Sequence, residues 1–277
     1  MGDTGLSLHR TGDGLACACH TTAAIGHPRG RVVLLHGLRS HAGWYTATRT
    51  QLSAAGYEVA FLDRRGAGLN TAQRGDTPSF HRLIADVAEV IRELKRTRNS
   101  LPLVLAGISW GGKLALGVAA AHPRLVDGVA LLCPGLVARV QPPFTTRLRI
   151  ALARFLRPTR RFPIPLNAPE LFTASPLWQQ FIAHDPHGLT EATARFLFES
   201  VRFDLHLKRR VKRVACPVLL MLAGRDRILD NPATRRYLAR LTNARSIHVV
   251  DYPGVHHTLE FEDAAYLPEL LRWMEQV

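Results

Sequence analysis

Short apolar runs alternate with amphipathic segments over the first half of the chain. Aliphatic and β-branched residues cluster, and predict strands, at Gly14–His20, Arg31–His36, Tyr57–Asp63, Leu101–Gly107 and Asp127–Cys133. Before the fourth run, apolar residues recur every three or four positions from Phe80 to Leu94, which predicts a helix with one buried face. Nearly all-apolar strands that alternate with helices are typical of a parallel sheet covered on both faces.

This alternation stops in the middle of the chain. Between residues 135 and 207 no segment resembles a strand, and eight prolines separate helix-like pieces. The alternation then resumes with a strand at Cys216–Gly224, a helix near 232–241, a strand at Arg245–Asp251 and a last helix near 264–274. We therefore expect one α/β core, formed by residues 1–134 and 208–277, with residues 135–207 inserted as a helical cap.

The composition is that of a globular chain. Hydrophobic residues make up 47% of the 277 residues and charged residues 21%, and no apolar run reaches the roughly 18 residues that span a bilayer. The first residues show no secretory signal pattern, so we expect a cytoplasmic protein. Four cysteines in this length do not form a disulfide framework, and we expect each to be a small buried residue: Cys17, Cys19, Cys133 and Cys216.

A serine between two glycines follows the strand predicted at Leu101–Gly107. Gly107, Ser109 and Gly111 form a Gly-x-Ser-x-Gly motif directly before an Ala- and Leu-rich segment that Pro123 ends. A nucleophilic serine on such a sheet must project from a sharp strand-to-helix turn, where a Cβ two residues before or after it would clash. The motif and its position therefore indicate that Ser109 is a nucleophile.

The end of the strand Arg31–His36 offers the hydrogen-bond donors that such a nucleophile needs. Glycine at position 37 allows the backbone to approach Ser109, and the N–H groups of Leu38 and Trp110 would form an oxyanion hole. His36 precedes the serine in the chain, so we expect it to be structural rather than catalytic. The candidates for contact with substrate are His36, Gly37 and His256.

Two pairs of residues compete for the remaining roles in a triad. An acid is expected just after the first strand that follows the insertion, where both Asp226 and Asp230 occur. Asp230 stands before an Asn-Pro pair, as the N-cap of a helix would. A base is expected in the loop after the last strand, which contains His256 and His257.

These motifs together resemble the α/β-hydrolase superfamily and, within it, the monoacylglycerol lipase/lysophospholipase-like group, also called serine aminopeptidase S33-like hydrolases. The resemblance rests on HG at 36–37, GISWGG at 107–112, GRDRILD at 224–230 and YPGVHHTLEFE at 252–262. It implies an α/β-hydrolase fold, with a mostly parallel central sheet, helices on both faces and a cap. It also places the triad acid at Asp226, and the group's G-x-x-H-x-L pattern, met by Gly254 and Leu259, selects His257 as the base.

The resemblance implies a serine hydrolase that cleaves carboxylic esters through an acyl-enzyme, with a monoacylglycerol, a lysophospholipid or another small acyl ester as substrate. The same triad also serves acyl transfer and the cleavage of amides, thioesters or C–C bonds. A pseudo-hydrolase that only binds a ligand is the non-enzymatic alternative. No cofactor is expected, and because no histidine stands at metal-ligand spacing from Cys or Asp, we expect no metal. The motifs imply no particular oligomeric state.

The net charge of +14 is concentrated in and beside the predicted cap, because residues 135–213 contain 14 Lys and Arg against 5 Asp and Glu. Within this region, residues 145–157 form a basic amphipathic segment. Its apolar face consists of Leu148, Leu152, Phe155 and Leu156. Such a helix either associates weakly with an anionic membrane surface or packs on its own domain. General attraction of anions is enough to explain the basic run Lys208–Arg213, and no specific nucleic-acid partner is expected.

Overall fold

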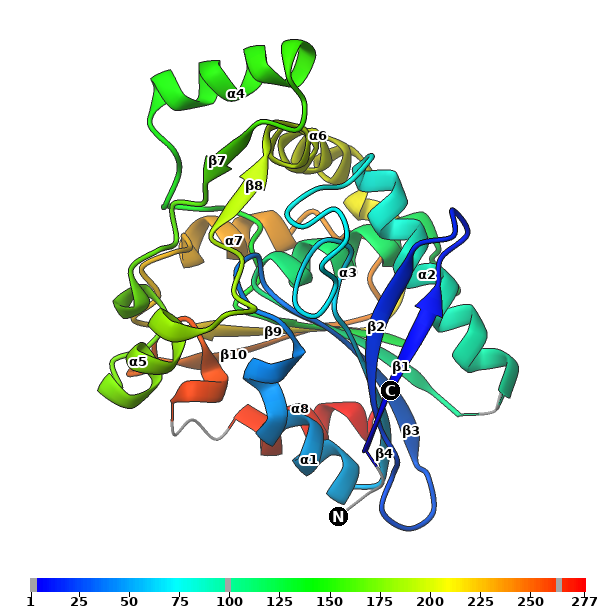
Figure 1. Cartoon of the computed structure of the whole chain (residues 1–277). Helices are drawn as coiled ribbons and strands as arrows, with labels where there is room; N and C mark the ends of the chain where they lie inside the picture. The colour runs from blue at the N-terminus through cyan, green and yellow to red at the C-terminus, as the bar shows by residue number, and fades with distance from the viewer. Residues whose placement is uncertain (1–3, 98–100, 263–265) are drawn as a thin grey trace.

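The computed structural model describes residues 4–97, 101–262 and 266–277, and its centre is an eight-stranded sheet (Figure 1). The strands lie in the order β1-β2-β4-β3-β5-β6-β9-β10. Their bounds are β1 Thr4–Arg10, β2 Ala16–Thr22, β3 Gly30–Leu35, β4 Tyr57–Leu62, β5 Leu103–Ile108, β6 Gly128–Leu132, β9 Val218–Ala223 and β10 Ile247–Tyr252. All pairs from β4 to β10 are parallel, whereas β1 and β2 extend one edge in antiparallel pairing. The mostly parallel sheet that the sequence predicts is confirmed.

The central strands are buried because helices cover both faces of the sheet. Every residue of β3, β5, β6 and β9 is buried, which agrees with their apolar runs without alternation. Helices α1 (Thr46–Ala54) and α8 (Tyr266–Met274) contact each other on one face, and α2 (Phe80–Thr97) and α3 (Trp110–Ala121) contact each other on the other (Figure 1). Helix α7 (Asn231–Leu238) lies between β9 and β10 in the chain.

The segment between β6 and β9 contains helices, as expected, but also two strands. The helices are α4 Phe144–Leu156, α5 Pro176–His184 and α6 Ala194–Arg210. Strand β7 (Arg161–Pro163) pairs antiparallel with β8 (Glu191–Thr193). The expectation of an insertion without strands was wrong, because three-residue strands are too short to leave a periodic pattern in the sequence.

Part of this insertion belongs to the main core. Phe196 and Phe203 of α6 are buried in the same cluster as the central strands. Helix α4 packs instead through a small separate cluster that includes Ile150 and Ala153, and it stands away from the sheet (Figure 1). The cap limits of 135–207 remain a prediction, since α6 continues without a break to Arg210.

Short 3-10 helices connect several of these elements, at Ala42–Tyr45, Pro169–Leu171, Val211–Arg213 and Leu259–Phe261. None of the helices in the described ranges combines the length and the apolarity needed to cross a bilayer. All four cysteines are free and buried, as expected.

Candidate active site

Ser109 occupies a strained turn between β5 and α3. Its φ of 52° and ψ of −121° lie in a region that costs a non-glycine residue about 1–3 kcal/mol. The flanking glycines are required by close packing, because a Cβ on Gly107 would lie 2.4 Å from the Gly111 oxygen and a Cβ on Gly111 would lie 2.3 Å from the Leu35 oxygen. The half-buried Ser109 hydroxyl makes no hydrogen bond with the described residues. The turn therefore presents this hydroxyl above the sheet edge.

The loop after β3 approaches the same serine. A Cβ on Gly37 would lie 3.2 Å from the Ser109 Cβ, a tight contact that glycine avoids. In the described part of the chain, the N–H groups of Leu38 and Trp110 donate no hydrogen bond. Neither of these two backbone donors is thus occupied by a described acceptor.

His36 supports this loop with both of its ring nitrogens. Its Nδ1 donates to the Gly37 carbonyl at 2.8 Å, and its Nε2 accepts from the Arg64 N–H at 3.0 Å. The Gly37 carbonyl belongs to the same peptide unit as the Leu38 N–H, so this hydrogen bond orients and polarises that donor. Complete burial lowers the pKa of His36 to about 3. The ring is therefore neutral at physiological pH and is fully engaged in structural hydrogen bonds.

Asp226 and His257 form a buried pair at the carboxyl ends of β9 and β10. The Asp226 Oδ2 accepts from the His257 Nδ1 at 2.7 Å. The other oxygen, Oδ1, accepts from the N–H groups of Ile228 at 2.8 Å and Leu229 at 3.0 Å, which fixes the carboxylate. The opposite ring nitrogen of His257, Nε2, is buried and has no hydrogen-bond partner among the described residues. One ring nitrogen of His257 is therefore held by a hydrogen bond to Asp226, and the other has no partner among the described residues.

The competing acid and base have other partners. Asp230 accepts from the Ala233 N–H and caps α7, as its position before an Asn-Pro pair predicts. His256 contacts Glu262, with Nδ1 3.1 Å from Oε2. Of the two pairs, the structure joins Asp226 with His257 and leaves Asp230 and His256 outside that contact.

The backbone brings Ser109 to the same edge as this pair. Its N–H donates to the Leu132 carbonyl at 2.9 Å, and the next residue, Cys133, has a sulfur within 4.8 Å of ligand atoms of both Asp226 and His257. Strands β5, β6 and β9 are neighbours in the sheet, so their carboxyl ends meet there. The described contacts include no hydrogen bond between the Ser109 hydroxyl and the free His257 nitrogen.

Cys133 is a component of the site that sequence reasoning missed. It has a positive φ of 43°, and its thiol lies beside the buried carboxylate of Asp226. Burial raises the pKa of the Cys133 thiol well above its usual value, and the nearby Asp226 charge raises it further. Cys133, Asp226 and His257 could together offer three ligands to a metal. A metal there would have to displace the thiol proton and compete with the Asp226–His257 hydrogen bond.

Arg64 is the second component that the sequence analysis did not identify. The side chain is buried, donates to the Leu38 carbonyl at 2.6 Å, and lies 5.2 Å from the Trp110 ring centroid. Burial lowers its pKa to about 9. No signal in the sequence indicates that this arginine is buried, because its position depends on the aromatic ring of Phe196 from α6, 5.1 Å away.

Comparison with known proteins assigns the chain to a family. A family model described as serine aminopeptidase, S33, matches residues 26–264. The monoacylglycerol lipase of Mycolicibacterium smegmatis is 25% identical over 89% of this chain and 88% of its own length, and human monoglyceride lipase is 24% identical over 93% and 84%.

Solved structures share the fold. A crystal structure of monoglyceride lipase from Saccharomyces cerevisiae superposes with a TM-score of 0.85 at 18% identity, covering 100% of this chain and 95% of that one. A carboxyl esterase from Bacillus coagulans also gives a TM-score of 0.85, at 15% identity, covering 100% and 99%. The chain therefore belongs to the serine aminopeptidase S33 family and is a hydrolase of the lipase and esterase type with the α/β-hydrolase fold.

Proposed function

We propose that the protein hydrolyses carboxylic esters through an acyl-enzyme on Ser109, with His257 as general base and Asp226 as the residue that orients it. The observation that carries this proposal is the buried Asp226–His257 hydrogen bond, which leaves Nε2 free at the edge where Ser109 projects. An imidazole held by a carboxylate, with its other nitrogen free to take a proton, is the arrangement that activates a serine as a nucleophile. A protein that only binds ligands has no use for it.

In the proposed reaction, His257 Nε2 takes the hydroxyl proton as Ser109 Oγ bonds to the ester carbonyl carbon. The Leu38 and Trp110 N–H groups stabilise the oxyanion, and the Asp226 carboxylate stabilises the imidazolium. Collapse of the intermediate breaks the C–O bond, and the imidazolium returns the proton to the leaving alcohol. Water then attacks the acyl-enzyme by the same steps and releases the acid.

The names of the relatives support a substrate class. Several are named monoacylglycerol or monoglyceride lipases, which supports a monoacylglycerol or a similar small acyl ester, with lysophospholipid included. Gly37 would face the reacting carbonyl, and His256 would lie near the mouth of the site. His36 acts on the substrate only through the peptide that it orients, because both of its ring nitrogens are occupied.

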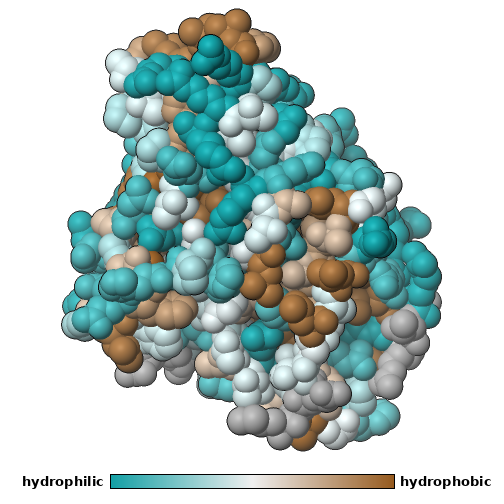
Figure 2. Space-filling model, viewed as in Figure 1, coloured by the Kyte–Doolittle hydropathy of each residue, from teal (hydrophilic) through white to brown (hydrophobic). Residues whose placement is uncertain are grey.

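Helix α4 supports a second part of this proposal, that the protein associates weakly with anionic lipid surfaces. Ile150 and Ala153 pack inward, while the predicted apolar face is exposed and gathers at the top of the molecule (Figure 2). Its exposed fractions are 55% for Leu148, 62% for Leu152, 74% for Phe155 and 71% for Leu156. Exposed arginines flank this face. An apolar face rimmed by cations has the composition of an interfacial helix.

Hydrolysis of p-nitrophenyl esters of increasing chain length, followed by a monoacylglycerol, tests the enzymatic proposal. We expect turnover by the wild type, loss of activity in Ser109→Ala, and wild-type activity in the control Ser246→Ala, which removes an exposed hydroxyl. Retained turnover in folded Ser109→Ala, or transfer of the acyl group only to an added acceptor, would contradict it.

Vesicle flotation tests the lipid proposal separately. We expect binding to anionic vesicles but not to neutral ones, and loss of that binding in Leu148→Ser/Leu152→Ser. The control Leu177→Ser changes a leucine that is 69% exposed on α5 instead. Equal binding to both vesicle types, or equal loss in the control, would remove the lipid proposal and leave the esterase proposal intact.

A further inference from the structure

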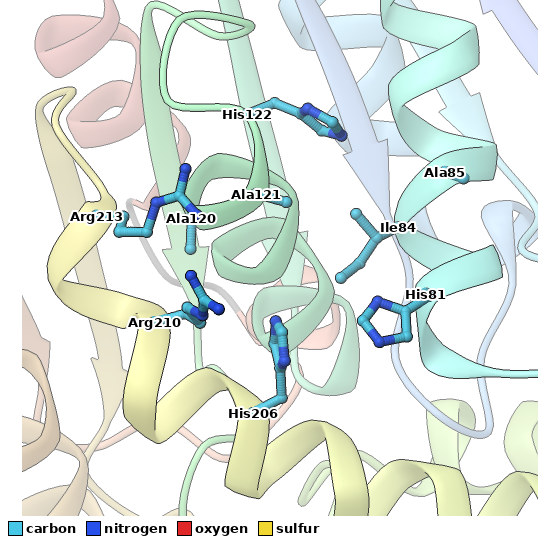
Figure 3. Close-up of a pocket in the computed structure, with 9 residues that line it drawn as sticks. All are labelled: His81, Ile84, Ala85, Ala120, Ala121, His122, His206, Arg210 and Arg213. Atoms are coloured by element: carbon cyan, nitrogen blue, oxygen red, sulfur yellow. The ribbon is translucent and has the colours of Figure 1, made fainter.

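A cavity of about 350 Å³ lies at the opposite end of α3 from Ser109, and Figure 3 shows the residues that line it. It is bounded by the start of α2, the end of α3 and the end of α6 with the 3-10 helix after it. Ala120 and Ala121 form part of its wall, and their short side chains leave the space open. Helix α3 has twelve residues, so about 18 Å separate this cavity from the serine at its other end.

The polar lining of this cavity is entirely basic or imidazole. It consists of His81, His122, His206, Arg210 and Arg213, and no carboxylate contributes. In Figure 3 these side chains reach from three different elements toward the space between the helices. The His81 and His206 rings meet edge to face, with centroids 5.3 Å apart.

The charges in this lining have no counter-charge in the described part of the protein. Arg210 and Arg213 form no ion pair or side-chain hydrogen bond with any described residue. Other arginines do find partners, as Arg65 does with Asp13 and Asp86. Burial lowers the pKa of His122 and of His206. Nearby positive charges lower these pKa values further, from Arg92 and Arg213 at His122 and from His81, Arg210 and Arg209 at His206.

A second hollow in the protein surface is also lined mainly by basic side chains. It is lined by Arg92, Lys95, Arg96 and Leu125, and of these cations only Lys95 has a described acidic partner, Asp127. The charges of Arg92, from the second hollow, and of Arg213, from the first, both act on His122. A concave, positively charged surface lowers the electrostatic energy of an anion much more than scattered exposed arginines do.

We propose that this cavity, at Arg210, Arg213 and the three histidines, is a binding site for a phosphate monoester group, separate from the catalytic site. Two guanidinium groups offer paired N–H donors that match the oxygens of phosphate. Their combined charge balances a phosphate dianion, whereas a carboxylate would leave half of it unneutralised. The imidazoles supply further hydrogen bonds to the same oxygens. The group belongs either to a small phosphorylated metabolite or to a lipid headgroup.

Titration of the histidine ring signals by NMR tests the site with inorganic phosphate and with a soluble phosphate monoester. We expect saturable shifts at His81, His122 and His206 in the wild type. Arg210→Gln/Arg213→Gln should weaken binding about tenfold or more. The matched control Arg10→Gln/Arg236→Gln removes the same charge from exposed positions elsewhere and should change the dissociation constant less than about twofold.

Flotation with vesicles that contain phosphatidic acid separates the two sources of phosphate. Binding to these vesicles that requires Arg210 and Arg213, without saturable binding of the soluble ester, identifies a lipid headgroup. Saturable binding of the soluble ester that requires the same arginines identifies a free metabolite. If neither probe binds, or if both double variants lose binding equally, the site does not exist. Ester hydrolysis should be unchanged in Arg210→Gln/Arg213→Gln, so failure here is distinguishable from failure of the esterase proposal.

Discussion

Two aspartates four residues apart have different environments in the structure. Asp226 accepts from His257 and from two backbone N–H groups, whereas Asp230 caps α7. Removing the charge of the first should affect chemistry, and removing the second should affect stability. The pair is therefore a test in which each residue is the control for the other.

We predict that Asp226→Asn lowers kcat for ester hydrolysis on the order of 10³–10⁴-fold while the protein stays folded, because an amide no longer fixes the imidazole tautomer. Asp230→Ala should instead lower the free energy of unfolding by about 1 kcal/mol through loss of the cap and keep kcat near the wild-type value. Steady-state kinetics and urea unfolding of both variants measure these effects. The reverse pattern would move the triad acid to Asp230.

The neutral, buried His36 predicts a pH dependence of stability. Its pKa in the folded protein is about 3, below the ordinary value of 6.5, so protonation favours the unfolded chain. Its contribution is therefore complete above pH 6.5 and is lost as the pH falls toward 3, by up to about 1.4 kcal/mol per pH unit. We predict a shallower fall for His36→Asn than for the wild type in urea unfolding between pH 7 and pH 5. Parallel curves would show that His36 titrates normally.

Residue identity was predictable where sterics or chain order constrain it. Gly-x-Ser-x-Gly identifies the strained turn at Ser109. Chain order limited the acid to Asp226 or Asp230 and the base to His256 or His257, and only the family resemblance chose between them. The surroundings were not predictable. Cys133 and Arg64 take their places from contacts with β9 and α6, more than 80 and 130 residues away in the chain, and no local pattern records such contacts.

At the scale of single elements, the turn from β5 into α3 depends on its glycines. We predict that Gly111→Ala lowers the free energy of unfolding by roughly 1–3 kcal/mol and removes activity, because the added Cβ would meet the Leu35 carbonyl oxygen at 2.3 Å. Gly254→Ala is the control, since a Cβ there meets nothing within 4 Å. Thermal unfolding and kinetics of the two variants give the comparison. Equal stability of the two would contradict the packing argument.

Substitutions on the two faces of helix α4 test which face stabilises the fold. Ile150 is 7% exposed in a small cluster, whereas Leu152 is 62% exposed. We predict that Ile150→Ala costs about 2 kcal/mol and that Leu152→Ala changes stability by less than about 0.5 kcal/mol. Urea unfolding, with hydrogen exchange of α4 as a local readout, measures both. A larger effect of Leu152→Ala would mean that the predicted apolar face packs on the protein itself.

Elements with a long periodic pattern were predictable and short ones were not. The helix predicted from Phe80 onward is α2, and the runs at Arg31–His36 and Cys216–Gly224 are β3 and β9, shifted by one or two residues. Strands β7 and β8 have three residues each and exist because they pair with each other across 27 intervening residues. Pairing of this kind depends on the tertiary fold.

At the scale of the whole molecule, the parallel sheet brings the residues of the proposed site together. Strands β5, β6, β9 and β10 are consecutive in the sheet, and their carboxyl ends carry Ser109, Cys133, Asp226 and the loop to His257. The cap contributes Phe172, whose ring centroid lies 6.0 Å from that of His257. The basic surface around Arg210 lies at the opposite end of α3 from Ser109 and is separate from this edge.

The central claim is that Ser109 is the nucleophile that Asp226 and His257 activate. Peptide mapping by mass spectrometry after treatment with a fluorophosphonate tests it most directly. We predict one adduct per chain, on the peptide that contains Ser109, no adduct in Ser109→Ala, and much slower labelling of Asp226→Asn. An adduct on any other residue, or no adduct on folded wild-type protein, would contradict the claim.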